Sequence, residues 1–270
     1  MLEIKNVSKT FNAGTLNQVH ALVNIDLHIE KGEFVVVIGT NGSGKSTLLN
    51  AIAGLFPVDT GRIRISGVDV TKQPEYKRAK LIGRVFQDPF RGTSPNMSIA
   101  ENIVLASRRG QKRGFNWALK KPITEEIKNK VKDLNLGLED RLFNMIGSLS
   151  GGQRQSLTLL MATWLKPSLL LLDEHTAALD PKSGERVIQL TEEIVEKDNL
   201  TTLMVTHSMH QAANIGDRLI MMYRGRIIHD FKGAEKKRLR VDDLLDRFEQ
   251  VRREEQLDES AADLLKERYV

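Results

Sequence analysis

The segment from Gly39 to Ser46 has a residue spacing that suits phosphate binding. Its sequence, GTNGSGKS, fits the template G-x-x-x-x-G-K-[ST], in which glycines let successive backbone N–H groups converge on phosphate oxygens. An apolar run, FVVVIG, leads into the loop and a helical pattern follows it, so a helix dipole would add positive potential. We expect Lys45 to reach the β- and γ-phosphates of a nucleotide, and Ser46 to offer its hydroxyl to Mg²⁺. The alternative is a glycine-rich turn with an incidental lysine.

Three polar residues, Asp173, Glu174 and His175, follow four leucines at the end of a second apolar run. They could form a metal site, a general-base site or only a polar strand end. Because ligands gather at the carboxyl ends of strands in open α/β sheets, we expect Asp173 to hold Mg²⁺ or one of its waters. Glu174 is then placed to act as a base, or to orient a water in line with the γ-phosphate. Without the phosphate loop, two solvated acids would be the better interpretation.

The run LSGGQ, residues 149–153, stands directly before a helical pattern. The N-terminus of a helix is ready to bind an anion. A serine at that position can equally serve as an ordinary N-cap. The five residues by themselves leave both interpretations open.

Periodicity indicates the elements that must position these groups. Alternating apolar residues predict strands within LEIKNVSKTF and HALVNIDLHIEKGE at the start of the chain. From residue 88 to about residue 165 the pattern is helical, and DRLIMMYRGRIIHDF predicts a final hairpin that turns at Arg224-Gly225. Buried strands are indicated at 34–39, 169–172 and 201–206, a partly exposed strand at 61–70 and another strand at 80–87. The chain is therefore predicted to be α/β, with a helical block inserted into a parallel sheet.

Length and composition narrow the class of protein. The chain has 270 residues, of which 40% are hydrophobic and 28% charged, as in soluble globular proteins. Its apolar runs are far shorter than the ~18 residues of a membrane helix, and MLEIKNVSK lacks the apolar core of a secretory signal. The chain has no cysteine, which excludes disulfides and cysteine-ligated zinc. The net charge of +5 fits ordinary surface charge, or an anionic partner such as a nucleotide, a membrane face or nucleic acid. We expect a cytosolic protein.

Six ordered motifs make the chain, from about residue 2 to residue 231, resemble the nucleotide-binding subunit of an ATP-binding cassette (ABC) transporter. This resemblance implies a P-loop NTPase (RecA-like) parallel-sheet core, an N-terminal antiparallel β subdomain and an inserted α-helical subdomain. The implied ATPase domain spans 1–235 with the helical insertion at about 88–158, and a charged amphipathic helical tail spans 236–270. The motifs are GTNGSGKST (39–47), VFQD (85–88), LSGGQ (149–153), LLLLDE (169–174), ALD (178–180) and His207 in VTHS.

The resemblance also implies roles for individual residues. Phe11 would stack on adenine, and Gln87 would touch both Mg²⁺ and the attacking water. His207 would contact the γ-phosphate and hold Glu174, while Asp180 would connect two sites across a dimer. His175 departs from the family pattern, which has proline there, so we expect it to shape the turn and not to react. Nucleotide contacts fall to Gly39, Thr40, Asn41, Gly42, Ser43, Gly44, Lys45, Ser46 and Thr47, and from the opposite subunit to Ser150, Gly151, Gly152 and Gln153.

A chain with one phosphate loop and one LSGGQ run would need a second copy to complete a site. The resemblance implies a head-to-tail dimer with two ATP molecules, and their Mg²⁺ ions, between the subunits. It also implies membrane permease subunits, which would place the chain on the inner face of the cell membrane, and an extracytoplasmic solute-binding protein. The segment DEHTAALDP resembles the corresponding segment in the ATPase subunits of small-solute importers, including some proposed for aromatic amino acids.

Two other functions stay open, an exporter ATPase and a single-cassette scaffold ATPase of the kind used in iron–sulfur cluster assembly. A nucleic-acid partner is not expected. The segment from 88 to 148 has only 61 residues, too few for the long coiled coil of DNA-repair cassettes, and translation-factor members carry two cassettes. The basic segment 108–121 could face lipid head groups, the permease or solvent, and the tail, residues 236–270, could contact the tail of the second subunit or solvent.

Overall fold

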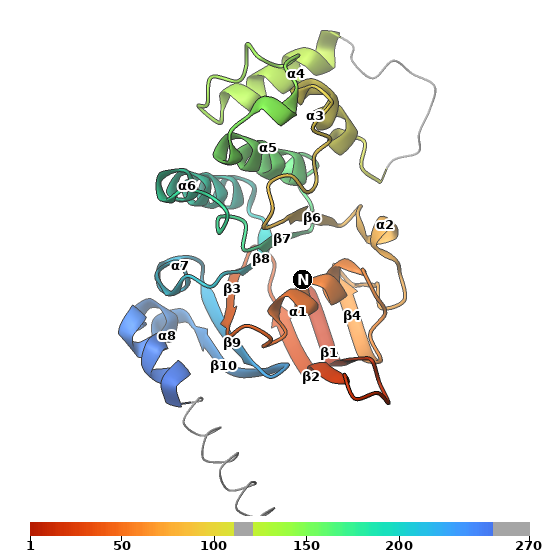
Figure 1. Cartoon of the computed structure of the whole chain (residues 1–270), viewed down its shortest axis with the longest axis vertical. Coiled ribbons are helices and arrows are strands. Elements are labelled where there is room, and N and C mark those ends of the chain that lie inside the picture. Colours follow the sequence, from red (N-terminus) through yellow and green to blue (C-terminus); the bar gives the residue numbers. More distant parts are fainter. Residues whose placement is uncertain (111–120, 251–270) are drawn as a thin grey trace, which may run out of the picture.

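The computed structural model describes residues 1–110 and 121–250 (Figure 1). Most of the basic segment 108–121 and the end of the tail, 251–270, lie outside these residues, so the predictions for them stay predictions. The strands are β1 (Leu2–Phe11), β2 (Val19–Ile29), β3 (Phe34–Gly39), β4 (Thr60–Ile65), β5 (Val68–Asp69), β6 (Ile82–Val85), β7 (Leu169–Asp173), β8 (Thr201–Val205), β9 (Arg218–Tyr223) and β10 (Arg226–Lys232). The helices are α1 (Lys45–Ala53), α2 (Glu75–Arg78), α3 (Ile99–Ser107), α4 (Lys121–Lys132), α5 (Gly151–Thr163), α6 (Pro181–Asp198), α7 (Met209–Asn214) and α8 (Gly233–Arg238), with a 3₁₀ turn at Ile146–Ser148. Residues 241–250 are helical as well.

The central sheet has six strands in the order β10-β9-β3-β8-β7-β6. β3 pairs in parallel with β8 and β9, and β7 pairs in parallel with β6 and β8. β10 runs antiparallel to β9, and Tyr223 pairs with Arg226 across the connection. Arg224 and Gly225 both have positive φ there, 43° and 74°, which is the conformation of a tight two-residue hairpin turn. The predicted hairpin is confirmed.

The buried strands face two separate cores because successive side chains point to opposite sides of a sheet. In β3, Val36 and Ile38 join a core that the helices α3 to α7 complete. Val35 and Val37 join a second core with α1 and the N-terminal strands. β7 divides its leucines in the same way. A strand covered on both faces buries every side chain, which favours the unbroken apolar runs of β3 and β7.

Two smaller units flank the central sheet. An antiparallel sheet of order β2-β1-β4-β5 packs its inner residues against α1. The helices α3, α4 and α5 form the inserted block between β6 and β7, and Figure 1 shows them at the opposite end of the molecule from the antiparallel sheet. Ser98 and Glu101 form a capping box at the start of α3, which satisfies backbone groups at the entry to the block. These arrangements confirm the predicted α/β fold class.

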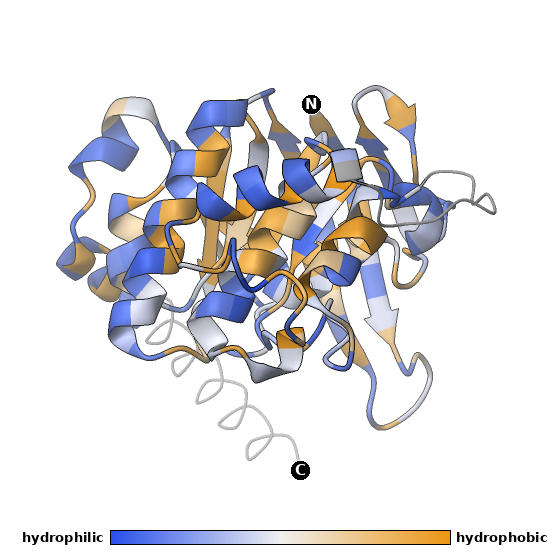
Figure 2. Cartoon of the chain, turned by 90° about the horizontal axis from the view of Figure 1, so that it is seen from above, coloured by the Kyte–Doolittle hydropathy of each residue, from blue (hydrophilic) through white to orange (hydrophobic). Residues whose placement is uncertain are grey.

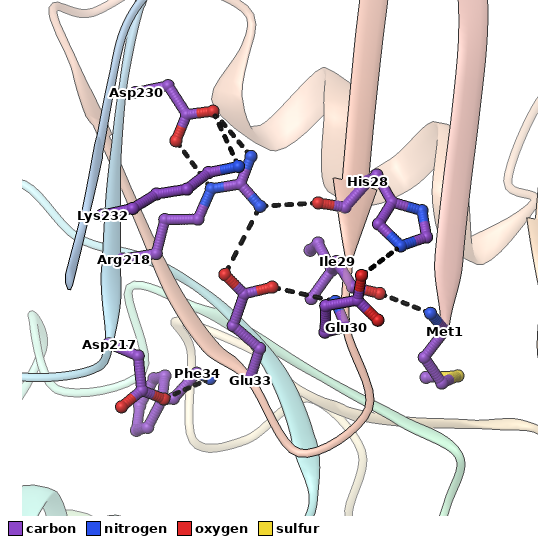
Figure 3. Close-up of polar contacts among 10 residues, drawn as sticks. All are labelled: Met1, His28, Ile29, Glu30, Glu33, Phe34, Asp217, Arg218, Asp230 and Lys232. Atoms are coloured by element: carbon purple, nitrogen blue, oxygen red, sulfur yellow. Dashed lines mark hydrogen bonds and ion pairs between the residues drawn. The ribbon is translucent and has the colours of Figure 1, made fainter.

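An ion-pair network ties the edge of the central sheet to the antiparallel sheet (Figure 3). Arg218 on β9 is 4% exposed and binds Asp230 of β10 with two bonds, from Nε at 2.6 Å and from Nη2 at 2.7 Å. Its Nη1 donates to the carbonyl of His28 on β2 at 2.6 Å, and lies 3.4 Å from Glu33 before β3. One guanidinium therefore fixes four chain segments against each other.

The hydropathy pattern follows these layers. Figure 2 shows apolar residues gathered along the inner strands and the inner faces of helices, with hydrophilic residues on the outer turns. Within the described ranges, no helix combines the length and the apolar character needed to cross a membrane.

Candidate functional site

The phosphate loop joins β3 to α1 at the carboxyl end of a central strand. Gly42 and Gly44 have φ of 80° and 99°, in the left-handed region that residues with a Cβ rarely adopt. A Cβ on Gly39 would lie 2.4 Å from the Met222 carbonyl oxygen, and one on Gly44 would lie 2.5 Å from that of Ala21. No side chain caps the start of α1, so the loop leaves backbone N–H groups for an anion. The backbone donor set fits a nucleotide phosphate.

Lys45 lies within this loop and not in solvent. Its Nζ donates to the carbonyls of Gly39 at 2.9 Å and Thr40 at 3.0 Å. Burial lowers the pKa of Lys45, while the nearby charges of Glu174 and Asp173 oppose that shift. An ammonium group that has lost part of its water and is held by neutral carbonyls is well placed to bind a phosphate oxygen.

Asp173 ends β7 and faces the start of α1 across the sheet edge. Ser46 Oγ donates to its Oδ1 at 3.4 Å, and Arg84 Nη2 donates to its Oδ2 at 3.4 Å. Burial raises the pKa of Asp173, although Arg84 and Ser46 oppose the shift. A hydroxyl beside a carboxylate oxygen is the kind of hard donor pair that Mg²⁺ takes, so these residues fit the predicted metal. Arg84 did not figure in the sequence prediction.

Glu174 turns out of the strand direction directly after Asp173. Its φ is 45°, and its backbone N–H donates to the Val205 carbonyl at 2.9 Å. Its Oε2 lies 3.4 Å from Nδ1 of His207, which follows β8. The parallel pairing of β7 with β8 brings this acid and this histidine together, as predicted. A left-handed conformation in a residue other than glycine is often found at functional sites.

His175 lies in the core and points away from these groups. It is 1% exposed, and its Nε2 lies 3.0 Å from Thr191 Oγ1 on α6. Because Thr191 donates its own hydrogen to the Val187 carbonyl, His175 is the donor of this bond. Burial lowers the pKa of His175 to about 4, so its ring is neutral near pH 7. The side chain therefore anchors the turn after Glu174 to α6.

The LSGGQ residues start α5 and contact the start of α6. Ser150 and Gln153 form a capping box with two bonds of 3.3 Å. A Cβ on Gly152 would lie 2.8 Å from Cβ of Ser183, so glycine is what permits the close approach of α5 and α6. Asp180 caps α6 by accepting a bond from the Ser183 N–H at 3.0 Å. In the parts of the chain that the structure describes, no hydrogen bond or ion pair links this region to the phosphate loop.

Gln87 and Phe11 are two further predicted site residues, and among the described residues neither makes a hydrogen bond to the phosphate loop or to the two acids. Gln87 is exposed in the loop after β6, and the preceding carbonyl, of Phe86, accepts a bond from Gln155 at 2.9 Å. Phe11 ends β1 and packs edge-on against Phe56, with ring centroids 5.2 Å apart. Across residues 1–110 and 121–250, no hydrogen bond or ion pair joins Gln87 to Asp173 or Glu174.

The geometry is that of an ATP-hydrolysing cassette, and comparison with known proteins agrees. Residues 22–177 match the family model described as ABC transporter. This match spans more than half of the 270 residues, so the chain belongs to the ATP-binding cassettes of the ABC transporter family. It is an ATPase of that class.

Individual relatives cover nearly the whole chain. It is 45% identical over 249 residues to the tyrosine transport ATP-binding protein of Clostridioides difficile (strain R20291), covering 92% of this chain and 99% of the relative. It is 36% identical over 232 residues to the glutamine transport ATP-binding protein of Escherichia coli (strain K12), covering 85% and 90%. Among solved structures, a dimeric post-hydrolysis state of the ATP-binding cassette MJ0796, bound to ADP and phosphate, has a TM-score of 0.73 at 31% identity. It covers 86% of this chain and 98% of that one.

Proposed function

We propose that this chain is the ATP-hydrolysing subunit of a membrane importer for a small solute, with an aromatic amino acid such as tyrosine as the leading candidate. The 45% identity to a tyrosine transport ATP-binding protein, over nearly the full length of both chains, supports this assignment. The single structural observation that carries the ATPase role is the contact between Glu174 and His207 beside the phosphate loop.

Nucleotide binding would use the loop and the strand end together. Lys45 would exchange its bonds to the carbonyls of Gly39 and Thr40 for bonds to the β- and γ-phosphates. Ser46 and Asp173 would hold Mg²⁺, joined by Gln87 on the exposed side. When bound, Mg²⁺ would offset the negative charge of the phosphate oxygens. Phe11 would stack on adenine, with its own ring supported edge-on by Phe56.

Hydrolysis would depend on Glu174 and His207. Glu174 accepts a proton from the attacking water or orients that water in line with the γ-phosphate. His207 keeps the carboxylate in place through its Nδ1, and its exposed ring can also meet a γ-phosphate oxygen. The buried bond from His175 to Thr191 holds the turn on which Glu174 stands.

The second half of each site would come from another copy of the chain. In the described ranges, no hydrogen bond joins the phosphate loop to the LSGGQ residues of the same chain, namely Ser150, Gly151, Gly152 and Gln153. In a two-fold dimer each LSGGQ run would face the partner's γ-phosphate, and Asp180 would lie near the dimer axis. The dimeric form of the similar cassette bound to ADP and phosphate supports this arrangement.

A hollow of about 970 Å³ beside β6 would receive a helix of the permease. Its walls come from α2, from the helical insertion and from the edge of the central sheet, and include Tyr76, Arg84, Phe86, Leu105 and Met161. Tyr76 and Leu105 are exposed, at 72% and 55%, so apolar surface is available to a partner. We propose that residues 1–235, with the insertion at about 88–158, form the working cassette, and that 236–270 form a separate tail.

This partner would hold the chain on the inner face of the membrane, and an extracytoplasmic binding protein would deliver the solute. A direct test is to reconstitute the chain with its permease in vesicles and to measure uptake of labelled tyrosine. ATP-dependent uptake that excess unlabelled tyrosine blocks, and glutamine does not, supports the proposal. Uptake should stop with Glu174→Gln. Co-purification with soluble proteins alone, and no membrane subunit, would contradict it.

A further inference from the structure

Arg84 lines the hollow beside β6 and also contacts Asp173 of the proposed metal site. It stands on β6, and its Nη2 donates to Asn50 Oδ1 on α1 at 2.6 Å and to Asp173 Oδ2 on β7 at 3.4 Å. The guanidinium also lies over the ring of Phe86, 4.5 Å from the centroid. The Arg84 side chain is only 11% exposed. A largely desolvated cation thus connects the strand that carries Asp173 with the helix that carries Lys45 and Ser46.

The two oxygens of Asp173 have different partners. Oδ2 faces Arg84, and Oδ1 faces the hydroxyl of Ser46. A carboxylate with one oxygen engaged by a guanidinium cannot rotate without losing a charge-assisted hydrogen bond. Oδ1 therefore stays turned toward Ser46, on the side where the cation would bind. Groups behind a metal ligand commonly fix its orientation and raise metal affinity in this way.

Few contacts hold Arg84 itself in place. Its Nε and Nη1 are buried and have no hydrogen-bond partner among the described residues. Asn50 and Asp173 are thus the acceptors that direct the guanidinium, and Asn50 makes the shorter bond. Removing the bond from Arg84 to Asn50 should let the guanidinium change position. The carboxylate of Asp173 should then lose its fixed orientation.

We propose that Arg84 is a positioning residue of the metal site, which orients Asp173 so that its Oδ1 and the Ser46 hydroxyl face the cation. This role rests on the proposed binding of Mg²⁺ by Ser46 and Asp173. Arg84 touches neither the nucleotide nor the water, and it acts only through the carboxylate.

The test compares the purified chain with Arg84→Met, which keeps the side-chain volume but removes the charge and the donors, and with Arg84→Lys. The first readout is the rise in melting temperature on adding ATP, measured in EDTA and across a Mg²⁺ titration. The second is kcat and KM for ATP at each Mg²⁺ concentration. We expect Arg84→Met to raise the Mg²⁺ concentration for half-saturation by about 10-fold or more, with the ATP-induced rise in EDTA unchanged. Arg84→Lys should recover part of the loss, because it restores the charge without the planar fork.

Two further variants separate positioning from simple loss of stability. Asn50→Ala leaves the charge of Arg84 in place but removes its shorter bond, and should raise the Mg²⁺ requirement by an intermediate factor. Arg78→Met removes another buried arginine, which donates only to backbone carbonyls such as those of Ala51 and Ile52. Arg78→Met should lower the melting temperature and leave the Mg²⁺ requirement unchanged.

The outcomes distinguish a failure of the role of Arg84 from a failure of the Mg²⁺ site itself. An unchanged Mg²⁺ requirement in Arg84→Met, or an equal rise in Arg78→Met, would overturn the role of Arg84 while leaving the metal site intact. A wild-type chain whose ATP binding and turnover ignore Mg²⁺ would overturn the metal site itself, and the role of Arg84 with it.

Discussion

Asp173 and Glu174 are neighbours in the chain, yet the structure gives the two carboxylates different surroundings. Asp173 is held between Arg84 and Ser46. Glu174 turns away through its left-handed backbone and faces His207. One change of backbone direction thus separates a group suited to a cation from a group suited to a water molecule. Three predictions follow from this difference and from the residues around it.

Replacing Glu174 with glutamine keeps the shape of the side chain and removes its ability to accept a proton. We expect turnover to fall by about 100- to 10,000-fold, the usual contribution of a general base. ATP affinity should stay within a few-fold of the wild type, because Lys45 and the loop are intact. Phosphate release and equilibrium ATP binding measure the two quantities separately, and normal hydrolysis would remove Glu174 from the proposed role.

Replacing Lys45 with alanine should weaken ATP binding, which Glu174→Gln leaves nearly unchanged. The variant loses the buried ammonium that would bind the phosphates, and charge-assisted hydrogen bonds contribute about 1.5–3 kcal/mol each. We therefore expect ATP binding itself to weaken by roughly 10- to 100-fold or more. Calorimetric titration with ATP tests this expectation. Retained affinity with lost turnover would show that Lys45 acts only on the reaction.

Replacing His175 and replacing His207 should have different effects on the ATPase rate. His175→Pro removes a buried bond to Thr191 and should lower the unfolding free energy by about 1–3 kcal/mol. Its ATPase rate should stay within a few-fold of the wild type. His207→Ala should lose at least about 10-fold in rate, because Glu174 loses its partner. Initial rates at saturating ATP distinguish the pair, and a collapse of turnover in His175→Pro would contradict the assignment.

At the scale of elements, the network around Arg218 predicts how stability depends on pH. Burial alone would raise the pKa of Asp230, but the bonds from Arg218 outweigh it and hold the pKa below its ordinary value of 3.8. A lowered folded-state pKa adds stability above the unfolded-state value, and this contribution disappears as the pH falls through the folded-state value. The pair should therefore contribute at neutral pH and progressively less below about pH 4.

Asp230→Asn tests this contribution. At pH 7 the variant should be less stable than the wild type by roughly 1–3 kcal/mol, because it removes the charged partner that lies nearest to the buried guanidinium of Arg218. The difference should shrink as the pH falls below 3.8. Urea unfolding followed by circular dichroism at pH 7 and near pH 3 measures both values. A difference that is the same at both pH values would contradict the prediction.

The elements that sequence predicts well are those set by local patterns. The phosphate loop, the buried strands and the hairpin at Arg224-Gly225 each follow from residues that are adjacent in the chain. The contacts of Arg84 and His175 do not, because each depends on a distant partner. Arg84 meets Asp173 only after β6 and β7 pair, and His175 meets Thr191 only after α6 packs on the core. Such contacts leave no periodic signal in the sequence.

At the scale of the whole molecule, the chain carries two halves of a site that do not meet. The phosphate loop lies where β3 enters α1, and LSGGQ lies at the start of α5 in the inserted block (Figure 1). In the single chain, the side chains of Ser150 and Gln153 already have hydrogen-bond partners, because they form the capping box of α5. We propose that a second copy joins the two halves, with ATP lying between them, and this composite site is the central claim about function.

The most direct measurement is the mass in solution of Glu174→Gln, by size exclusion with light scattering, with and without ATP and Mg²⁺. A single chain has a mass of 30.4 kDa. We predict that ATP doubles the mass of Glu174→Gln, and that adding Ser150→Arg to the same chain abolishes the doubling while ATP still binds the loop. A mass that stays at that of one chain with ATP bound, or a dimer that forms despite Ser150→Arg, would contradict the composite site.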